Sequence, residues 1–384
     1  MIDIAILNKL NAPTKEQRLA NLAEVLKTAE FPPMVPQYIN NHIHTTYSFS
    51  PYSPTASVYA ARMEGLCTAG IIDHDSISGA EEFLEAAKLV DMPATIGMEC
   101  RVSMAGTRLE GKRTNNPDQV GVSYMTIQAV PHDKIPILTE FFRPYRQARH
   151  ERNRKMVARI NELLHFDLDY DRDVLPLSMA AEEGGVTERH LMYALAMKLV
   201  EQVGKGQPMV QKLTDMGLAL SQKQTEQMLD TAYPFYEYDL LGILKSAFVP
   251  QIFIDADEEC PLLPEMVKLC KDIDAYLCYA YLGDVGDSVT GDKKAQKFED
   301  DYLDDVFLCL QEEGVKAVTY MPTRNTMEQL TRLRSLCDKH GMFQISGEDI
   351  NSPRQSFIIR AMENPMFQNL VDATWQLIEH ENNA

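Results

Sequence analysis

Paired cysteines are missing from this sequence. It contains seven cysteines, an odd number, and no two of them form a Cys-x-x-Cys motif. A cysteine-rich zinc module is therefore not expected, and a disulfide framework is not typical of a chain this large. We expect reduced cysteines and a cytoplasmic protein.

Long apolar runs and excess positive charge are missing as well. No uncharged apolar run approaches the ~20 residues that a membrane helix needs, and the first residues lack the features of a signal peptide. Lys and Arg total 37 against 56 Asp and Glu, for a formal net charge of −19. Such a surface repels phosphate at long range, although it leaves room for a local basic pocket. We expect no binding to nucleic-acid polymers or membranes.

Motifs of serine nucleophiles and of nucleotide-binding loops are also absent. No Gly-x-Ser-x-Gly elbow occurs, so nucleophilic serine chemistry has little support. Residues 286–294 have the glycine spacing of a phosphate-binding loop, but Asp292 follows Gly291 where that loop requires a lysine. We interpret this stretch as an acidic loop, either at the rim of a metal pocket or on the plain surface.

Segments of strand and helix character alternate from residue 37 onward. The first expected strand ends at residues 42–44, and the others span 67–73, 94–99, 120–130, 248–254, 276–282, 315–320 and 342–346. Such alternation predicts parallel βαβ units and, with this many strands, a closed or nearly closed barrel. Uninterrupted helical character from 136 to about 232 indicates an insertion. We divide the chain into an N-terminal helical extension (1–36), a first barrel part (37–135), a helical insertion subdomain (136–245), and a second barrel part with a C-terminal helix (246–384).

The strongest candidates for chemistry are His42 and His44. Side chains two residues apart on a strand point the same way, and neutral imidazole is a good ligand for zinc, iron and manganese. Two solvated histidines at a polar strand end are the plain alternative. Other expected strands also end in metal-type residues, at 73–75, at Glu99 and at 348–349. The C-terminal ends of parallel strands are the face where barrels assemble their chemistry.

Each of these segments has an alternative interpretation when taken alone. Asp73 or Asp75 is a good N-cap for the next helix, Glu99 fits a solvated carboxylate, and the acidic residues after 346 fit a turn. Their shared location at strand ends favours a common metal site over these separate roles. His132 and Asp284 follow two other expected strands in the same way.

The motifs His42-Ile43-His44, Asp73-His74-Asp75, Glu99 and Gly-Glu-Asp-Ile-Asn at 347–351 resemble, in order and spacing, those of the PHP family (polymerase and histidinol phosphatase domains). The resemblance covers roughly residues 37–132 and 245–352. It implies an α/β fold, namely a distorted (β/α)7 TIM-like barrel, which here carries a helical insertion. It also implies a metal-dependent phosphoesterase that holds up to three ions.

The resemblance implies one complete metal site, formed by His42, His44, Glu99 and Asp349. A second site would share Glu99 and take His132, with Gln128 at a neighbouring position where a ligand is equally expected. Its other histidine is absent from residues 279–284.

A third site would use His74, but the family's remaining ligand positions read Phe49 or Ser50 and Asn351 here. Oxygen ligands from Asp284, Asp73 or Asn351 would favour manganese or magnesium over zinc. We expect one to three divalent ions, of Mn, Zn, Fe or Mg.

The resemblance and the ligand types together predict hydrolysis of a small phosphorylated metabolite or nucleotide by a metal-activated water. His74, His132 and Asp73 are the catalytic candidates, because a histidine here fits either a ligand or the acid that protonates the leaving group. Two alternatives remain open. The barrel binds a metal or ligand without catalysis, since some ligands are missing, or it hydrolyses a C–N bond as amidohydrolase-type barrels do.

Arginines are dense in residues 143–159, and residues three apart stay near one helical face. They fit substrate-phosphate capture or, as the more frequent outcome, salt bridges to the many carboxylates. The substrate-binding candidates lie elsewhere. Arg324 and Arg354 each follow a strand, and Arg189 and His190 open a helix of the insertion. The guanidinium fork suits a phosphate.

Overall fold

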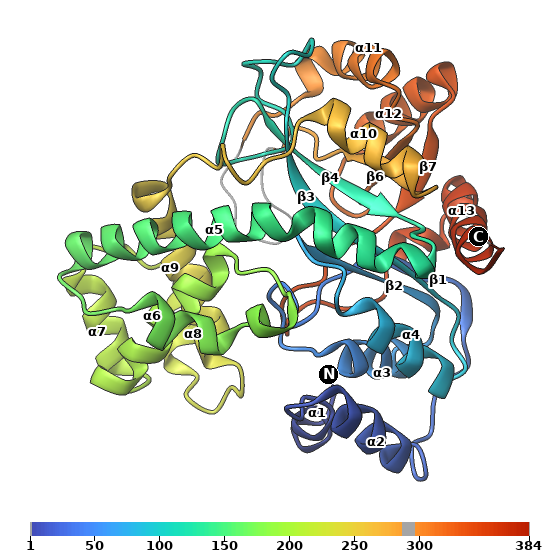
Figure 1. Ribbon diagram of the computed structural model, residues 1–384. Coiled ribbons are helices and arrows are strands. Elements are labelled where there is room, and N and C mark those ends of the chain that lie inside the picture. Colours follow the sequence, from blue (N-terminus) through green and yellow to red (C-terminus); the bar gives the residue numbers. More distant parts are fainter. Residues whose placement is uncertain (1, 286–295, 384) are drawn as a thin grey trace.

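The computed structural model describes residues 2–285 and 296–383, so the stretch 286–294 discussed above lies outside the described residues. Within them, seven strands form one sheet in sequence order (Figure 1). The strands are β1 (Val35–Ile43), β2 (Leu66–His74), β3 (Ala94–Ser103), β4 (Val122–Gln128), β5 (Tyr276–Ala280), β6 (Ala317–Tyr320) and β7 (Phe343–Ser346). Ile350, just after β7, forms a parallel bridge with Ile43 of β1. The sheet is therefore a nearly closed α/β barrel, as the sequence predicted.

One strand runs against the others. β4 is antiparallel to both β3 and β5, whereas every other neighbouring pair in the sheet is parallel. The prediction of parallel units throughout was therefore wrong for β4. No helix is assigned between β3 and β4, and without a crossover helix the chain returns along the strand it has just left. As a result, the residues after β4 lie at the opposite end of the barrel from those after β3.

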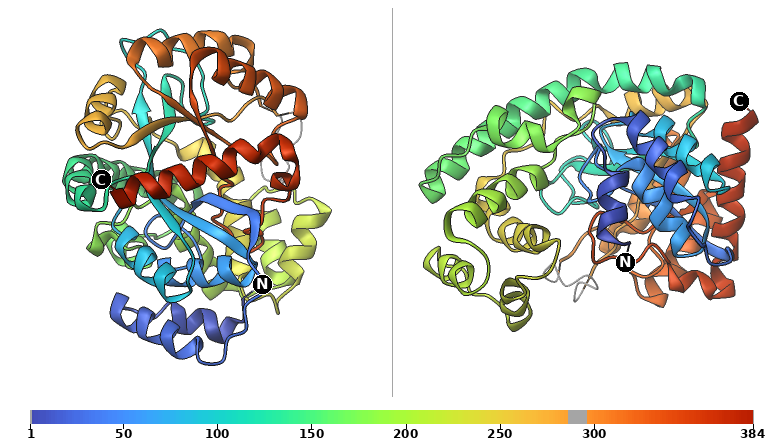
Figure 2. Two further views of the ribbon diagram at one scale, coloured as in Figure 1. Left: turned by 90° about the vertical axis from the view of Figure 1, so that its right-hand side faces the viewer. Right: turned by 90° about the horizontal axis from the view of Figure 1, so that it is seen from below.

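Helices outside the insertion cover the barrel. They are α1 (Ile4–Leu10), α2 (Lys15–Val25), α3 (Pro54–Met63), α4 (Ala80–Leu89), α10 (Leu263–Asp272), α11 (Leu303–Glu313), α12 (Met327–His340) and α13 (Gln368–Asn383). A buried ion pair between Arg18 and Glu82 fastens α2 to α4. α13 contacts β7, β1 and β3 and lies on the side of the barrel away from the helical insertion (Figure 2).

The expected strand at 248–254 is instead the end of helix α9 (Tyr236–Ile252). Its bulky apolar residues fit a strand, but Leu240, Leu244 and Phe248 recur every fourth residue and are buried in a helical core. Helical periodicity over the longer segment therefore prevailed over local strand character.

Between β4 and β5, the chain forms α5 (Ile135–Leu164), α6 (Glu188–Val203), α7 (Gln207–Asp215), α8 (Gln222–Leu229) and α9. These helices share a hydrophobic core separate from that of the barrel. The 30-residue helix α5 joins the two, because Leu138 and Phe142 belong to the barrel core while Met156 and Ile160 belong to the helical core (Figure 1). The exact domain boundaries stay a prediction. No helix among the described residues has both the length and the apolar character needed to cross a membrane.

Candidate metal centre

Side chains from three neighbouring strands meet at one mouth of the barrel. Nε2 of His42 lies 3.5 Å from Glu99 Oε2, and Nε2 of His44 lies 3.7 Å from the same oxygen. His74 ends β2 and is paired in register with Glu99 of β3, and its Nδ1 is 3.2 Å from Glu99 Oε2. Donor atoms of His42, His44 and Glu99 all lie within 4.8 Å of one another. The carboxylate of Glu99 thus lies between the imidazole rings of His42, His44 and His74.

Closure of the barrel brings Asp349 to the same place. Its Oδ1 is 3.2 Å from His44 Nε2, because Ile350 pairs with the end of β1. The approach needs a glycine at 347, where an added Cβ would lie 2.5 Å from the Cβ of His42. His42, His44, Glu99 and Asp349, predicted together from their strand ends, do converge, and their role as ligands stays a prediction.

Hydrogen bonds that link His44 to Ser48 and Ser48 to Asp73, on the side of the His44 ring opposite Nε2, fix the orientation of His44. Ser48 Oγ donates to Asp73 Oδ1 at 2.5 Å, so this hydroxyl accepts from His44 Nδ1, 3.1 Å away. Thr45 donates to both oxygens of Asp73 through its backbone N–H and its hydroxyl. In its neutral form, with the proton on Nδ1, His44 presents an unprotonated Nε2 to the cluster, as a metal-binding histidine requires.

Two buried nitrogens support the fit of a cation. Nε2 of His42 and Nε2 of His44 are buried and have no hydrogen-bond partner among the described residues. A buried polar atom without a partner costs free energy, and a divalent ion between two imidazoles and a carboxylate would satisfy both. The donor set of nitrogen and carboxylate oxygen suits Zn²⁺, Mn²⁺ or Fe²⁺.

The charges in the cluster keep its carboxylates in the ionised form that binds metals. Burial alone would raise the pKa of Glu99, but the surrounding imidazoles hold the pKa at about 2. Desolvation by the surrounding protein would raise the pKa of Asp349, but His44 outweighs this effect, so the pKa of Asp349 is lowered. Burial would lower the pKa of His44, but the carboxylates of Asp349 and Glu99 raise it. The carboxylates are therefore ionised over the whole physiological range.

His74 connects this cluster with a small cavity. Its ring stacks on that of His44 at a centroid distance of 4.6 Å, and burial lowers its pKa to about 3. On its other side, His74 lines a cavity of about 60 Å³ between the barrel and the insertion. Four cationic side chains line it as well: Arg101, Arg149, Arg189 and Lys245.

A buried ion-pair network contributes Arg101, Arg149 and Glu188 to the wall of this cavity. Three arginines face three carboxylates there, namely Arg101, Arg149 and Arg152 against Asp75, Glu188 and Glu259. Five arginines of α5 thus bind carboxylates of this chain, the more frequent of the two outcomes considered above: Arg143, Arg146, Arg149, Arg152 and Arg154. Arg159 donates instead to the backbone carbonyls of Ile252 and Phe253. Spacing along the helix identified these arginines, but Glu188 and Glu259 are distant in sequence and carried no signal.

Asp73 and His132 do not join the cluster. The carboxylate oxygens of Asp73 are taken up by Thr45 and Ser48. His132 follows the antiparallel strand, and its Nε2 lies 3.6 Å from Glu381 of α13. Glu381 accepts from the backbone N–H of Ile96, at the start of β3. The prediction that His132 lies at the catalytic face was therefore wrong, because it assumed a parallel β4.

The four predicted substrate anchors occupy different places. Arg189 lies at the site, where its Nη2 donates to the carbonyl of Asn351 and its guanidinium lies over the ring of Phe49. His190 is buried and caps α6 by accepting from the N–H of Thr187. It is not directed into the cavity at His74.

Arg324 and Arg354 follow strands as expected, and each contacts other parts of the chain. Nε of Arg324 donates to the carbonyl of Leu282. Arg354 forms two hydrogen bonds with Asp239 of α9 and lies over the ring of Tyr233.

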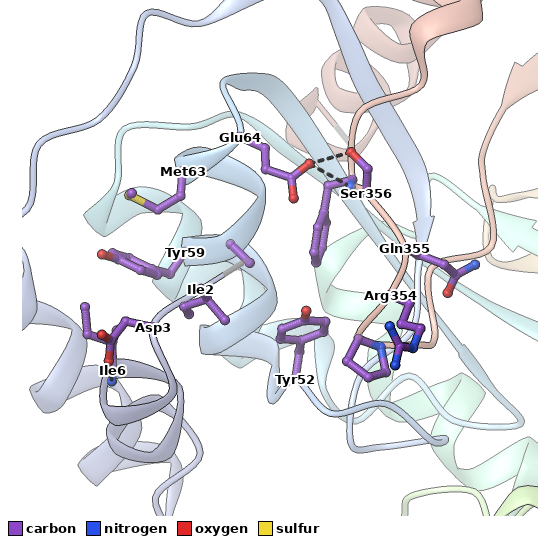
Figure 3. A pocket seen from close by; sticks show the side chains of 13 residues that line it. Ile2, Asp3, Ile6, Tyr52, Tyr59, Met63, Glu64, Arg354, Gln355 and Ser356 are labelled. Atoms are coloured by element: carbon purple, nitrogen blue, oxygen red, sulfur yellow. Dashed lines mark hydrogen bonds between the residues drawn. The ribbon is translucent and has the colours of Figure 1, made fainter. Parts of the chain in front are cut away.

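Arg354 also lines a second cavity, of about 610 Å³, between α1, α3 and the loop 353–357 (Figure 3). Tyr52 and Tyr59 point into it, and Glu64 binds Ser356 at its edge (Figure 3). None of the clustered histidines lines this cavity. The larger hollow is therefore separate from the candidate metal centre.

Positions expected to supply further ligands have other partners. Asp284 accepts from the N–H of Phe298, and the ring of Phe49 packs against His190. Asn351 donates from Nδ2 to Asp349 Oδ1 at 2.6 Å. The described residues therefore offer one well-formed group of ligands.

Comparison with known proteins adds two solved structures and a short sequence match. A structure from Bifidobacterium adolescentis, named "putative metal-dependent phosphoesterase", superposes with a TM-score of 0.54 and 19% identity, covering 88% of this chain and 98% of that one. An amidohydrolase from Chromobacterium violaceum superposes with a TM-score of 0.56 and 16% identity, covering 88% and 96%. At these identities the likeness shows a shared fold.

The sequence match is to error-prone DNA polymerases of Mycobacterium tuberculosis and Mycobacterium bovis. The identity is 33% over 96 residues, which make up 24% of this chain and 8% of each polymerase. The chain therefore spans a small part of the length of these relatives. No protein-family model matches the chain.

Proposed function

We propose that this protein is a metal-dependent hydrolase that cleaves a phosphate ester of a small molecule. The observation that carries the proposal is the pair of buried, unpartnered imidazole nitrogens of His42 and His44, which face the carboxylates of Glu99 and Asp349. This is a preformed nitrogen and oxygen donor set at the mouth of a barrel, where such enzymes assemble their chemistry.

Each residue has a proposed part. His42, His44, Glu99 and Asp349 would hold the ion, and Ser48 and Asp73 keep His44 in the binding tautomer. A divalent cation at such a site supplies Lewis-acid polarisation and a bound water of lowered pKa. His74 contacts Glu99 and lines the adjacent cavity, so it would contact both the ligands and the substrate.

The cationic cavity supports a phosphorylated substrate. Arg189 and Lys245 reach it from the insertion, whereas Arg101 and Arg149 already pair with carboxylates of the ion-pair network. Guanidinium groups bind phosphate through paired N–H donors. The cavity is small and the chain as a whole is acidic, which favours a small phosphorylated metabolite or nucleotide over a nucleic-acid polymer.

The comparisons support a hydrolase but do not distinguish between cleavage of a phosphate ester and cleavage of a C–N bond. One structural neighbour is named a phosphoesterase and the other an amidohydrolase. The polymerase match agrees with the resemblance to the PHP family, whose name includes polymerases. C–N bond hydrolysis is therefore the second candidate function, and the barrel geometry alone favours neither.

The decisive experiment combines metal analysis with a substrate panel. Protein purified without chelators is expected to contain a transition metal and to cleave members of a phosphomonoester and phosphodiester panel. His44→Ala and Glu99→Ala should each lose metal and at least ~100-fold of the activity, since removing even an outer partner of a ligand costs about 10–100-fold. His132→Ala is the matched control, because this histidine lies at the other end of the barrel.

Other outcomes would overturn parts of the proposal. Bound metal without cleavage of any ester or amide would make the protein a binding barrel. Cleavage of C–N substrates alone would change the reaction class. Equal losses in His132→Ala and His44→Ala would remove the catalytic centre from the cluster.

A further inference from the structure

Asp349 differs from the other proposed ligands in how it is held. His42, His44 and Glu99 lie on or directly after strands, and their side chains are buried, at 9%, 1% and 11% exposure. Asp349 lies in the loop after β7, and its side chain is 45% exposed. A half-exposed carboxylate on a loop loses conformational freedom when it binds an ion, so its affinity depends on what fixes the loop.

The barrel closure fixes the middle of this loop. Ile350 donates its N–H to the carbonyl of His42 and accepts from the N–H of His44, at 3.2 and 3.0 Å. These two bonds use the N–H and the carbonyl of Ile350 itself. The carbonyl of Asp349 and the N–H of Asn351, which belong to the same two peptide groups, need other partners.

One side chain binds both of these groups. Gln355 Nε2 donates to the carbonyl of Asp349 at 2.6 Å, and Gln355 Oε1 accepts from the N–H of Asn351 at 2.9 Å. Gln355 lies at the edge of the large cavity, with its amide pointing away from the Tyr52 ring (Figure 3). Its amide is thus committed to the loop that carries Asp349.

The loop in turn aims the carboxylate. Asn351 Nδ2 donates to Asp349 Oδ1, the oxygen that lies 3.2 Å from His44 Nε2. The carbonyl of Asn351 also accepts from Arg189 of the insertion. Asn351 occupies a position where the PHP resemblance implies a ligand, and here it serves as a hydrogen-bond donor to a ligand instead.

We propose that Gln355 is a positioning residue of the metal centre. By holding the backbone at Asp349 and Asn351, it directs Asp349 Oδ1 at His44 Nε2 before an ion binds, and it thereby sets the affinity for the ion. The proposal rests on the metal centre proposed above. Outer partners of ligands commonly contribute about 10–100-fold to metal affinity.

The test is a direct measurement of Mn²⁺ affinity, for example from the EPR signal of free Mn²⁺ during titration of the metal-stripped full chain. Gln355→Ala is expected to bind about tenfold more weakly. Gln329→Ala is the matched control, because Gln329 also accepts from a backbone N–H, that of Thr326, and donates to a backbone carbonyl, that of Asp284. It should bind Mn²⁺ as the unaltered protein does.

A double-mutant cycle separates positioning from general damage. In an Asp349→Ala background, Gln355→Ala should have no further effect on Mn²⁺ affinity, because its only route to the ion is gone. Should Gln355→Ala fail to fold, Gln355→Glu keeps the acceptor, loses the donor, and carries the same expectation.

The outcomes distinguish the two proposals. Unchanged affinity in Gln355→Ala, an equal loss in Gln329→Ala, or a further loss in the Asp349→Ala background would overturn the role of Gln355 and leave the metal centre standing. An unaltered protein that binds no Mn²⁺, Zn²⁺ or Fe²⁺ would overturn both.

Discussion

Two buried polar clusters lie next to each other at the junction of barrel and insertion, and they balance their charges differently. In the ion-pair network, three guanidinium groups face three carboxylates, and Glu188 accepts from Arg101, Arg149 and Arg152. In the histidine cluster, the Nε2 atoms of two buried imidazoles have no hydrogen-bond partner among the described residues. The two clusters share the cavity lined by His74 and Arg149.

This difference distinguishes a cluster with a structural role from a cluster suited to binding a ligand. A buried network whose charges cancel within the protein needs no ligand, and here it joins helices of the insertion to the barrel. A buried cluster whose acceptors lack partners gains them when a cation binds, and this is the role we propose for the histidine cluster. Burial and charge density alone would not have distinguished these two groups. The presence or absence of partners does.

The largest expected effect is on the network. Glu188→Ala leaves three buried arginines short of one carboxylate, and breaking a buried ion pair costs about 3–5 kcal/mol of unfolding free energy. Chemical denaturation should show this loss, while Glu201→Ala, an exposed carboxylate of the same helix, should change stability little. A loss in Glu188→Ala as small as that in the control would mean that the network does not hold the insertion in place.

A second prediction concerns His190, a buried histidine outside the cluster that accepts a hydrogen bond from Thr187. It concerns the dependence of stability on pH. Burial lowers the pKa of His190 to about 3, below the ~6.5 of an unfolded histidine. Between these values the unfolded chain binds a proton that the folded chain does not, so stability falls as the pH falls below about 6.5. His190→Gln keeps an acceptor for Thr187 and should remove about 2 kcal/mol of the stability loss between pH 7 and pH 5.

Urea denaturation at both pH values measures this difference directly. Mn²⁺ affinity at pH 7 should be unchanged in His190→Gln, since His190 binds Thr187 rather than the cluster. A parallel pH profile for the variant and the unaltered protein would show that His190 is protonated equally in the folded and unfolded states.

The smallest expected effect is that of Asp73, which supports His44 through Ser48, on the affinity for the ion. Asp73→Asn replaces an acceptor of three hydrogen bonds with a group that also carries donors, so Ser48 no longer holds His44 in one tautomer. Mn²⁺ affinity should fall about tenfold, or ~1.4 kcal/mol, as measured by competition with a chelator. Asp133→Asn, at an exposed aspartate, is the control, and equal affinities in the two variants would contradict the proposed link from Asp73 to the ion.

The sequence was sufficient for the barrel and for the convergence of His42, His44, Glu99 and Asp349, because both follow from strand periodicity and from the common end of parallel strands. It was insufficient where long-range pairing decides. The direction of β4 depends on how the chain returns from β3, and the error at His132 followed from it.

The roles of the polar residues that surround the proposed ligands could not be predicted from the sequence either. Asp73 and His74 are adjacent in sequence, yet one binds the backbone and hydroxyls of the 45–48 loop and the other faces Glu99. Neighbouring residues on a strand point to opposite faces, but residue type alone does not tell which face holds the ion. The arginines of α5 were identified, whereas their carboxylate partners, Glu188 and Glu259, became visible only in the fold.

The bridge between Ile43 and Ile350 also sets an order of events during synthesis. Both histidines and Glu99 lie in the first hundred residues of the chain, but Asp349 reaches them only when the last strand closes against the first. A nascent chain therefore carries three of the four proposed ligands long before it carries the fourth. On our proposal, tight binding of the ion therefore waits until Ile350 has left the ribosome and paired with Ile43.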